Sequence, residues 1–150
     1  MKRLNHNVRV LVTDGGRATV FRNKGQAGRP ELEVVRTYEN DNAPTRELGT
    51  DKPPRANSVS GNRSAIETTD YHQQNEDRFV EQIADDMKKD LMAGDFEELV
   101  VVAPPVALGV FRKKAAAQVE KATLASINKD LTRHSAADLA TIVVKELEGA

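Results

Sequence analysis

The N-terminal part of the chain places apolar and polar side chains in short alternating runs, separated by turn-forming residues. In residues 8–13 valine stands at every second position, and a two-residue period is typical of a β-strand. The Asp-Gly-Gly of residues 14–16 suits a tight hairpin turn, because glycine readily adopts positive φ. Two more strands are predicted over about 17–23 and 31–38, with turn residues at 24–30 between them. Three strands joined by short turns predict an antiparallel meander.

A helical period replaces this alternation in the middle of the chain. One apolar stripe consists of Phe79, Val80, Ile83, Ala84, Met87 and Leu91. Asp70, with Gln73 three residues later, resembles a capping box. We therefore expect a long helix that begins at Asp70 and ends at Gly94, a residue type that commonly follows helix C-termini.

The C-terminal third alternates between strands and helices. The run Leu99–Ala103 is apolar without alternation, which is typical of a strand covered on both faces by helices. We expect a helix over about 106–118, a last strand over about 121–127, and a final helix that Ser135 and Asp138 cap. The order is three strands, a long loop, then helix, strand, helix, strand and helix.

This order predicts one α/β domain over residues 1–150, with a mixed five-stranded sheet of ribonuclease H-like topology. The strand at 99–103 should lie beside the first strand and parallel to it. The segment at about 39–69 shows no period and is rich in Pro, Gly, Asn, Ser and Thr. Long irregular segments inside compact domains are commonly functional or disordered, so we predict a loop here and expect it to carry the binding site.

Composition narrows the possible functions. The net charge is −1, so no global field attracts nucleic acid, and any RNA contact must use a local patch. The absence of cysteine excludes disulfides, thiolate zinc sites and a cysteine nucleophile. The N-terminus lacks the apolar centre of a signal peptide, and no apolar run approaches the ~20 residues that span a bilayer. We therefore expect a cytoplasmic protein without membrane insertion.

Several short motifs stand in the order found in a known family. They are Val10–Ala18, Ser60–Ala65, Arg78-Phe79, Leu99–Pro105 with Leu108-Gly109, and Lys129–Thr132. Through them the chain resembles the bacterial host-attachment protein family, named for a requirement in attachment to host cells. That family is similar to the middle domain of archaeo-eukaryotic peptide-chain release factors. The release-factor domain carries a Gly-Gly-Gln motif in the loop before its long helix, where it promotes peptidyl-tRNA hydrolysis.

The corresponding residues here are Ser60-Gly61-Asn62, so serine replaces one glycine and asparagine replaces glutamine. This departure weighs against hydrolysis by the release-factor route. We expect Ser60, Gly61, Asn62, Arg63 and Ser64 to form the tip of a ligand-binding loop. Gly61 permits close backbone approach, while Asn62 and Arg63 donate hydrogen bonds to phosphate or to a backbone. The alternative is a solvated loop without a function.

Other candidate chemistry is weaker. Arg112, Lys113 and Lys114 form a dense basic cluster and are possible further contacts, but on a helix they fan over about 200°. A solvated face is therefore favoured over an RNA contact. Ribonuclease H-like nucleases hold two metal ions with clustered carboxylates. Asp14 ends the first strand, but the strand at 99–103 carries no carboxylate, so Asp14 is better explained as a hairpin residue.

The histidines are far apart, and no nucleophile elbow, phosphate loop or dinucleotide motif occurs. We expect no metal, no cofactor and no catalytic residue. The leading hypothesis is a non-enzymatic binding module that engages RNA, the ribosome or the wider translation apparatus through the loop around Gly61. One alternative is a hydrolase of peptidyl-tRNA or a similar ester. Another is a protein-interaction domain that binds no nucleic acid.

Overall fold

The computed structural model describes residues 2–40 and 61–149, with side chains from residue 73 onward in the second range. Its strands are β1 (Arg9–Thr13), β2 (Arg17–Asn23), β3 (Leu32–Glu39), β4 (Leu99–Ala103) and β5 (Thr123–Asn128). Its helices are α3 (Gly61–Met92), α4 (Pro105–Lys114), α5 (Ala117–Ala122) and α6 (Ala136–Glu148).

The strands form one mixed sheet in the order β3-β2-β1-β4-β5. β1 pairs antiparallel with β2, and β2 pairs antiparallel with β3, which confirms the predicted meander. β1 pairs parallel with β4, so that Leu11 lies opposite Val101. The predicted α/β fold and its ribonuclease H-like strand order are therefore confirmed.

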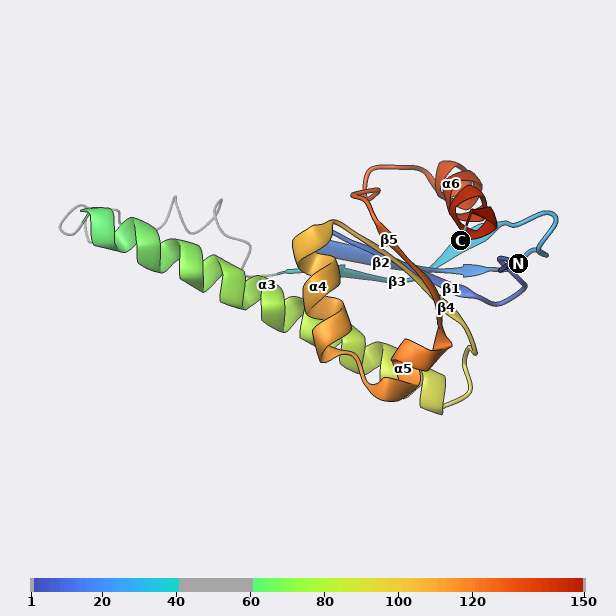
Figure 1. Ribbon diagram of the computed structural model, residues 1–150, viewed down its shortest axis with the longest axis horizontal. Coiled ribbons are helices and arrows are strands. Elements are labelled where there is room, and N and C mark those ends of the chain that lie inside the picture. Colours follow the sequence, from blue (N-terminus) through green and yellow to red (C-terminus); the bar gives the residue numbers. More distant parts are fainter. Residues whose placement is uncertain (1, 41–60, 150) are drawn as a thin grey trace.

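Helices cover both faces of this sheet (Figure 1). On one, the α3 face, side chains of α3, α4 and α5 pack around Leu11 and Val101. On the other, the α6 face, α6 packs against Val10, Val12 and Val100. Every residue of β1 and β4 is buried, because these two strands have helices on both sides.

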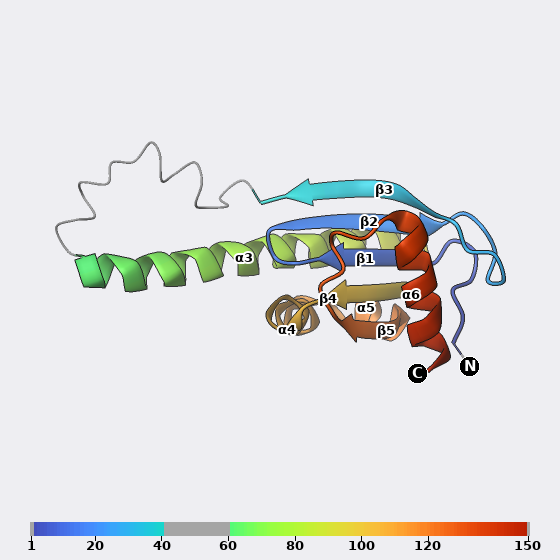
Figure 2. The ribbon, with the colours of Figure 1, turned by 90° about the horizontal axis from the view of Figure 1, so that it is seen from above.

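The helix α3 is longer than predicted. It begins at Gly61 and not at Asp70, so the predicted irregular segment at 39–69 overlaps the last residue of β3 and the first turns of α3. Residues 41–60 lie outside the described part of the chain. Figure 2 gives the physical reason, because the N-terminal portion of α3 extends past the sheet, so the sheet offers it no surface to pack against. Without that surface, the sequence needs no apolar stripe there, and periodicity cannot reveal the helix.

The predicted helix at 106–118 is two helices. Ala115 and Ala116 are extended, with ψ of 141° and 157° where a helix has about −42°, and they separate α4 from α5. An alanine run favours a continuous helix by propensity. Phe111 before the break is 1% exposed and Val119 after it is fully buried, so tertiary packing overrides that preference. The last strand consequently begins at Thr123, slightly later than predicted.

Other local predictions are confirmed. Ser135 caps α6 by accepting a hydrogen bond from the Asp138 amide at 3.1 Å. Gly94 has a φ of +83° just beyond α3, and Gly15 has a φ of +92° in the first hairpin turn. The apolar stripe predicted for α3 is buried from Phe79 to Met87, and Leu91 packs against the same core.

Candidate functional site

The projecting end of α3 is the most prominent feature of the molecule (Figure 2). The helix has 32 residues and is therefore about 48 Å long. Gln73 and Gln74 are exposed, and Asn75 is the first buried side chain among those that the structure describes on α3. The helix thus packs on the sheet through its C-terminal half and presents its N-terminal turns beyond it.

The structure places the predicted loop residues Gly61, Asn62, Arg63 and Ser64 in the first turn of α3. Ser60 lies outside the described residues. The prediction of a loop at Gly61–Ser64 is therefore wrong in its local structure, because this backbone is helical. A helical residue has negative φ, so Gly61 does not act through a left-handed backbone. Their role in ligand binding stays a prediction.

The turn between β1 and β2 supports α3 near the point where the helix leaves the sheet. A Cβ at Gly15 would lie 3.3 Å from Oε1 of Glu76 on α3, so the turn and the helix are in close contact. Asp14 accepts hydrogen bonds at Oδ1 from the amides of Gly16 at 2.8 Å and Arg17 at 3.0 Å. Asp14 is therefore a hairpin residue, as predicted.

The edge strand β3 is also fastened to α3. Nη2 of Arg36 lies 3.2 Å from Oδ2 of Asp90, and Nη1 donates a 2.9 Å hydrogen bond to the Tyr38 hydroxyl. The ring of Tyr38 meets Phe79 edge-on, with 6.2 Å between centroids. Burial of the phenol raises the pKa of Tyr38 to about 12.

The predicted basic cluster lies elsewhere. Lys114 at the end of α4 is 4.0 Å from Glu81 of α3, while Arg112 and Lys113 are exposed. Glu81 stands twenty residues after Gly61, which is about 30 Å along the helix. The structure therefore does not bring the two sets of candidate residues together. Three cations in the last turn also suit the negative end of the α4 dipole, which is a structural reason for their presence.

Titratable side chains do not gather into a catalytic arrangement in the part that the structure describes. Among these residues, no three His, Asp or Glu side chains lie close enough to hold a metal ion. Nδ1 of His6 lies 2.9 Å from the carbonyl of Gly25 in a distant turn. The Thr132 hydroxyl donates a hydrogen bond to the Asp130 carboxylate and lowers the pKa of that carboxyl. Asp130 therefore stabilises the turn in which it stands. No helix in the described ranges is long and apolar enough to cross a membrane.

The sequence matches one protein family over most of its length. Residues 7–143 match the model of bacterial archaeo-eukaryotic release factor family 12. The chain belongs to this family. The match includes the turn at Asp14, the whole of α3 and most of α6, so it covers the elements that build and support the projecting helix. No curated protein matches the sequence.

Two solved structures are similar. One is the archaeal translation termination factor aRF1, with 14% identity, a TM-score of 0.49, and coverage of 95% of this chain. The other is Dom34 of S. cerevisiae, a translation termination-like factor involved in RNA quality control and interacting with Hbs1. It shows 11% identity, a TM-score of 0.44, and coverage of 97% of this chain. This chain spans 39% and 37% of the lengths of those two proteins.

Two features were not among the sequence predictions. The Asn75 side chain is 4% exposed, and its Nδ2 has no hydrogen-bond partner among the residues that the structure describes. Its position on the helix, four residues before Phe79, is a signal that could have suggested burial. The second feature is a groove beside α6, whose walls come from three separate parts of the chain. No short sequence motif predicts such a surface, because its residues are far apart in the chain.

Proposed function

We propose that this protein is a non-enzymatic binding module that engages RNA or the translation apparatus through the distal end of α3. One observation carries the proposal. The four residues singled out from sequence, Gly61–Ser64, form the first turn of a helix that extends beyond the sheet. Membership in a release-factor family supports translation as the setting.

A projecting helix suits binding to a large partner, because its end can enter a recess in the partner while the sheet remains outside that recess. The part from Gly61 to Gln74 is about 21 Å long. Helix N-termini also present unpaired amides and a partial positive charge, and no acidic residue stands in the first turn of α3. Asn62 and Arg63 add donors suited to phosphate oxygens.

The proposal excludes release-factor hydrolysis as the main activity. The position that the resemblance assigns to the reactive glutamine is occupied by Asn62, whose side chain is one methylene shorter. We further propose that the protein acts in the cytoplasm. Any role in attachment to host cells is then indirect, for example through the synthesis of other proteins.

The test is co-sedimentation with ribosomes over a range of salt concentrations. Arg63→Ala should weaken association and make its salt dependence shallower by about one phosphate contact. Arg133→Ala is the matched control, because Arg133 is exposed and stands just before α6, outside both sets of candidate residues. Equal behaviour of the two variants, or no association of the wild type with ribosomes or RNA, would contradict the proposal and favour a protein partner.

A further inference from the structure

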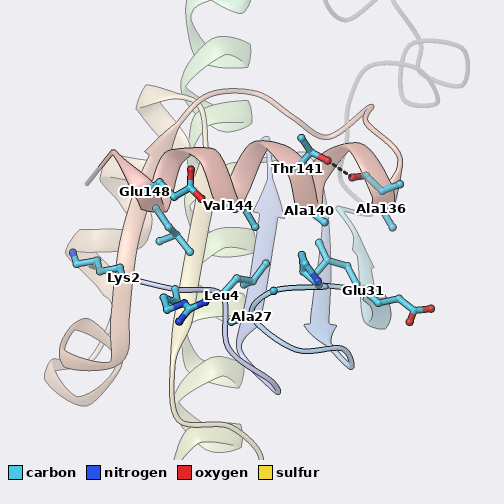
Figure 3. Close-up of a pocket in the computed structure, with 15 residues that line it drawn as sticks. Lys2, Leu4, Ala27, Glu31, Ala136, Ala140, Thr141, Val144 and Glu148 are labelled. Atoms are coloured by element: carbon cyan, nitrogen blue, oxygen red, sulfur yellow. Dashed lines mark hydrogen bonds between the residues drawn. The ribbon is translucent and has the colours of Figure 1, made fainter.

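A groove of about 750 Å³ runs beside α6 on the α6 face of the sheet (Figure 3). One wall is α6 itself, through Ala136, Ala140 and Val144. The opposite wall combines the N-terminal segment at Leu4 with the turn before β3 at Ala27. The groove lies on the opposite face from α3 and is independent of the function proposed above.

Most of the side chains that line the groove are apolar, and they leave space between the walls. Leu4 and Leu32 are 2% and 7% exposed and belong to the core beneath α6. Along the helix the lining side chains are small at Ala136, Ala137 and Ala140. Small residues allow the backbone of a neighbouring element to approach closely, whereas a leucine at these positions would fill the space.

The dimensions match those of a short helix. The α6 helix has 13 residues and is therefore about 20 Å long. Packed helices lie about 8–10 Å apart, so a helix of about three turns would follow α6 along the groove. Among the described residues α6 is the only helix on its face, whereas three helices cover the opposite face (Figure 1).

The charges on the rim give the groove a direction. Lys2 lies at the end where α6 finishes, across from Glu148, and Arg3 is next to it in the chain (Figure 3). Lys2 is held there because its Nζ donates a 2.6 Å hydrogen bond to the carbonyl of Leu124. Glu31 lies at the other end, near the start of α6, with Lys24 3.5 Å away.

We propose that this groove binds an amphipathic α-helix of a partner protein, running antiparallel to α6. Helices favour acidic residues in the first turn and basic residues in the last. In the antiparallel orientation the acidic first turn meets Lys2 and Arg3, and the basic last turn meets Glu31. The dipoles of the two helices are also opposed, which is favourable. The rim carries Glu31 and Glu148 beside Lys2 and Arg3, so the groove lacks the uniformly basic lining that favours a nucleic acid.

The experiment uses two designed helical peptides of 14 residues. Both carry the same apolar stripe, but one has an acidic first turn and a basic last turn, and its twin has the charges exchanged. Binding to the full chain is measured by fluorescence anisotropy, and the site is mapped by amide chemical shifts. The acidic-first peptide should bind roughly three- to tenfold more tightly than its twin, as expected for two exposed charge contacts. Shifts should concentrate on α6 and around Leu4 and Leu32.

Two variants complete the test. The double variant Lys2→Glu, Arg3→Glu should reverse the preference between the peptides. Ala137→Phe should block both peptides by filling the groove, and Ala117→Phe, at an exposed alanine of α5, should block neither. The proposal is overturned if neither peptide binds, if both bind equally, if the shifts fall away from α6, or if Ala137→Phe binds as the wild type does.

Discussion

The hydroxyl of Tyr38 donates a 2.7 Å hydrogen bond to Oδ2 of Asp86, and this contact joins the edge strand β3 to the helix α3. Edge strands are the least supported strands of a sheet, since one side of their backbone has no partner strand. Here the side chains of Tyr38 and Arg36 attach the edge strand to α3 instead. The same contact steadies the part of α3 from which the distal end projects.

Removal of the phenol hydroxyl should loosen this connection. Tyr38→Phe keeps the ring contact with Phe79 but deletes the hydrogen bond to Asp86, so we expect a loss of about 1 kcal/mol in the free energy of unfolding. Urea unfolding measures the loss. Thr37→Ala is the control, because Thr37 is exposed and should change stability little. An unchanged midpoint for Tyr38→Phe would show that the contact adds no stability.

The same pair predicts a response to alkaline pH. Burial raises the pKa of Tyr38 to about 12 from an ordinary value of 10.0, so folding favours the protonated phenol. The resulting stability is complete below about pH 10 and is lost as the pH rises toward 12. Absorbance titration of Tyr71→Phe isolates Tyr38, because the chain has two tyrosines.

Two further substitutions give opposite shifts in that titration. Asp86→Asn should lower the pKa of Tyr38, because the Asp86 carboxylate disfavours a nearby phenolate. Arg36→Gln should raise the pKa, because the guanidinium donates to the phenol oxygen and stabilises its charged form. Titration of Tyr38 near 10.0 in the folded protein would contradict the structural assignment.

The sequence predicts those parts of the fold whose side chains pack on the sheet. The strand at Leu99–Ala103 and the capped helix α6 carry patterns that burial imposes, and both were correctly predicted. The start of α3 was missed, because turns that extend past the sheet do not carry the apolar period that packing on the sheet imposes. The break between α4 and α5 was missed because it depends on tertiary packing. Phe111 and Val119 are both buried in one core, and local helix propensity carries no information about that packing.

For the candidate site, the motif singled out the residues but not their conformation. Gly61 suggested a loop, since glycine is common in turns, yet it is also acceptable at a helix start. The groove beside α6 could not be predicted at all. Its walls join Leu4, Ala27 and Ala140, which are far apart in the chain and meet only in the folded protein.

Two glycines in one turn should respond differently to the same substitution. A Cβ at Gly25 would clash with the carbonyl oxygen of Arg29, whereas a Cβ at Gly28 would meet none of the described residues within 4 Å. Neither glycine has positive φ. Gly25→Ala should therefore cost about 1–3 kcal/mol through overpacking. Gly28→Ala should be neutral or up to about 1 kcal/mol more stable, because the unfolded chain loses freedom. Thermal unfolding of both variants checks the contrast, and equal melting temperatures would contradict it.

Asn23 holds the same turn to the N-terminal segment. Its fully buried side chain donates to the carbonyls of Leu4 at 2.8 Å and Asn5 at 3.2 Å, and accepts from the amides of Gly25 at 2.9 Å and Glu31 at 2.8 Å. Asn23→Ala leaves these groups without that partner, so we expect a loss of about 2–4 kcal/mol. Denaturant unfolding measures it. Asn5→Ala should have little effect, because that side chain is exposed.

Asn75 should be the opposite case, a buried polar residue whose removal stabilises the fold. Its side chain is 4% exposed at the base of the projecting helix, and within residues 2–40 and 61–149 its Nδ2 has no hydrogen-bond partner. An unpaired buried amide costs about 1–3 kcal/mol in lost hydration.

Asn75→Leu replaces the amide with an apolar group of similar size and higher helix propensity, so the free energy of unfolding should rise by about 1 kcal/mol or more. Asn75→Asp is the paired test. It keeps the shape but introduces a charge into a buried position, so it should destabilise the fold. Denaturant unfolding of the wild type and both variants decides the matter. A less stable Asn75→Leu would mean that the amide does find an acceptor in solution, and that it contributes to holding α3 at its base.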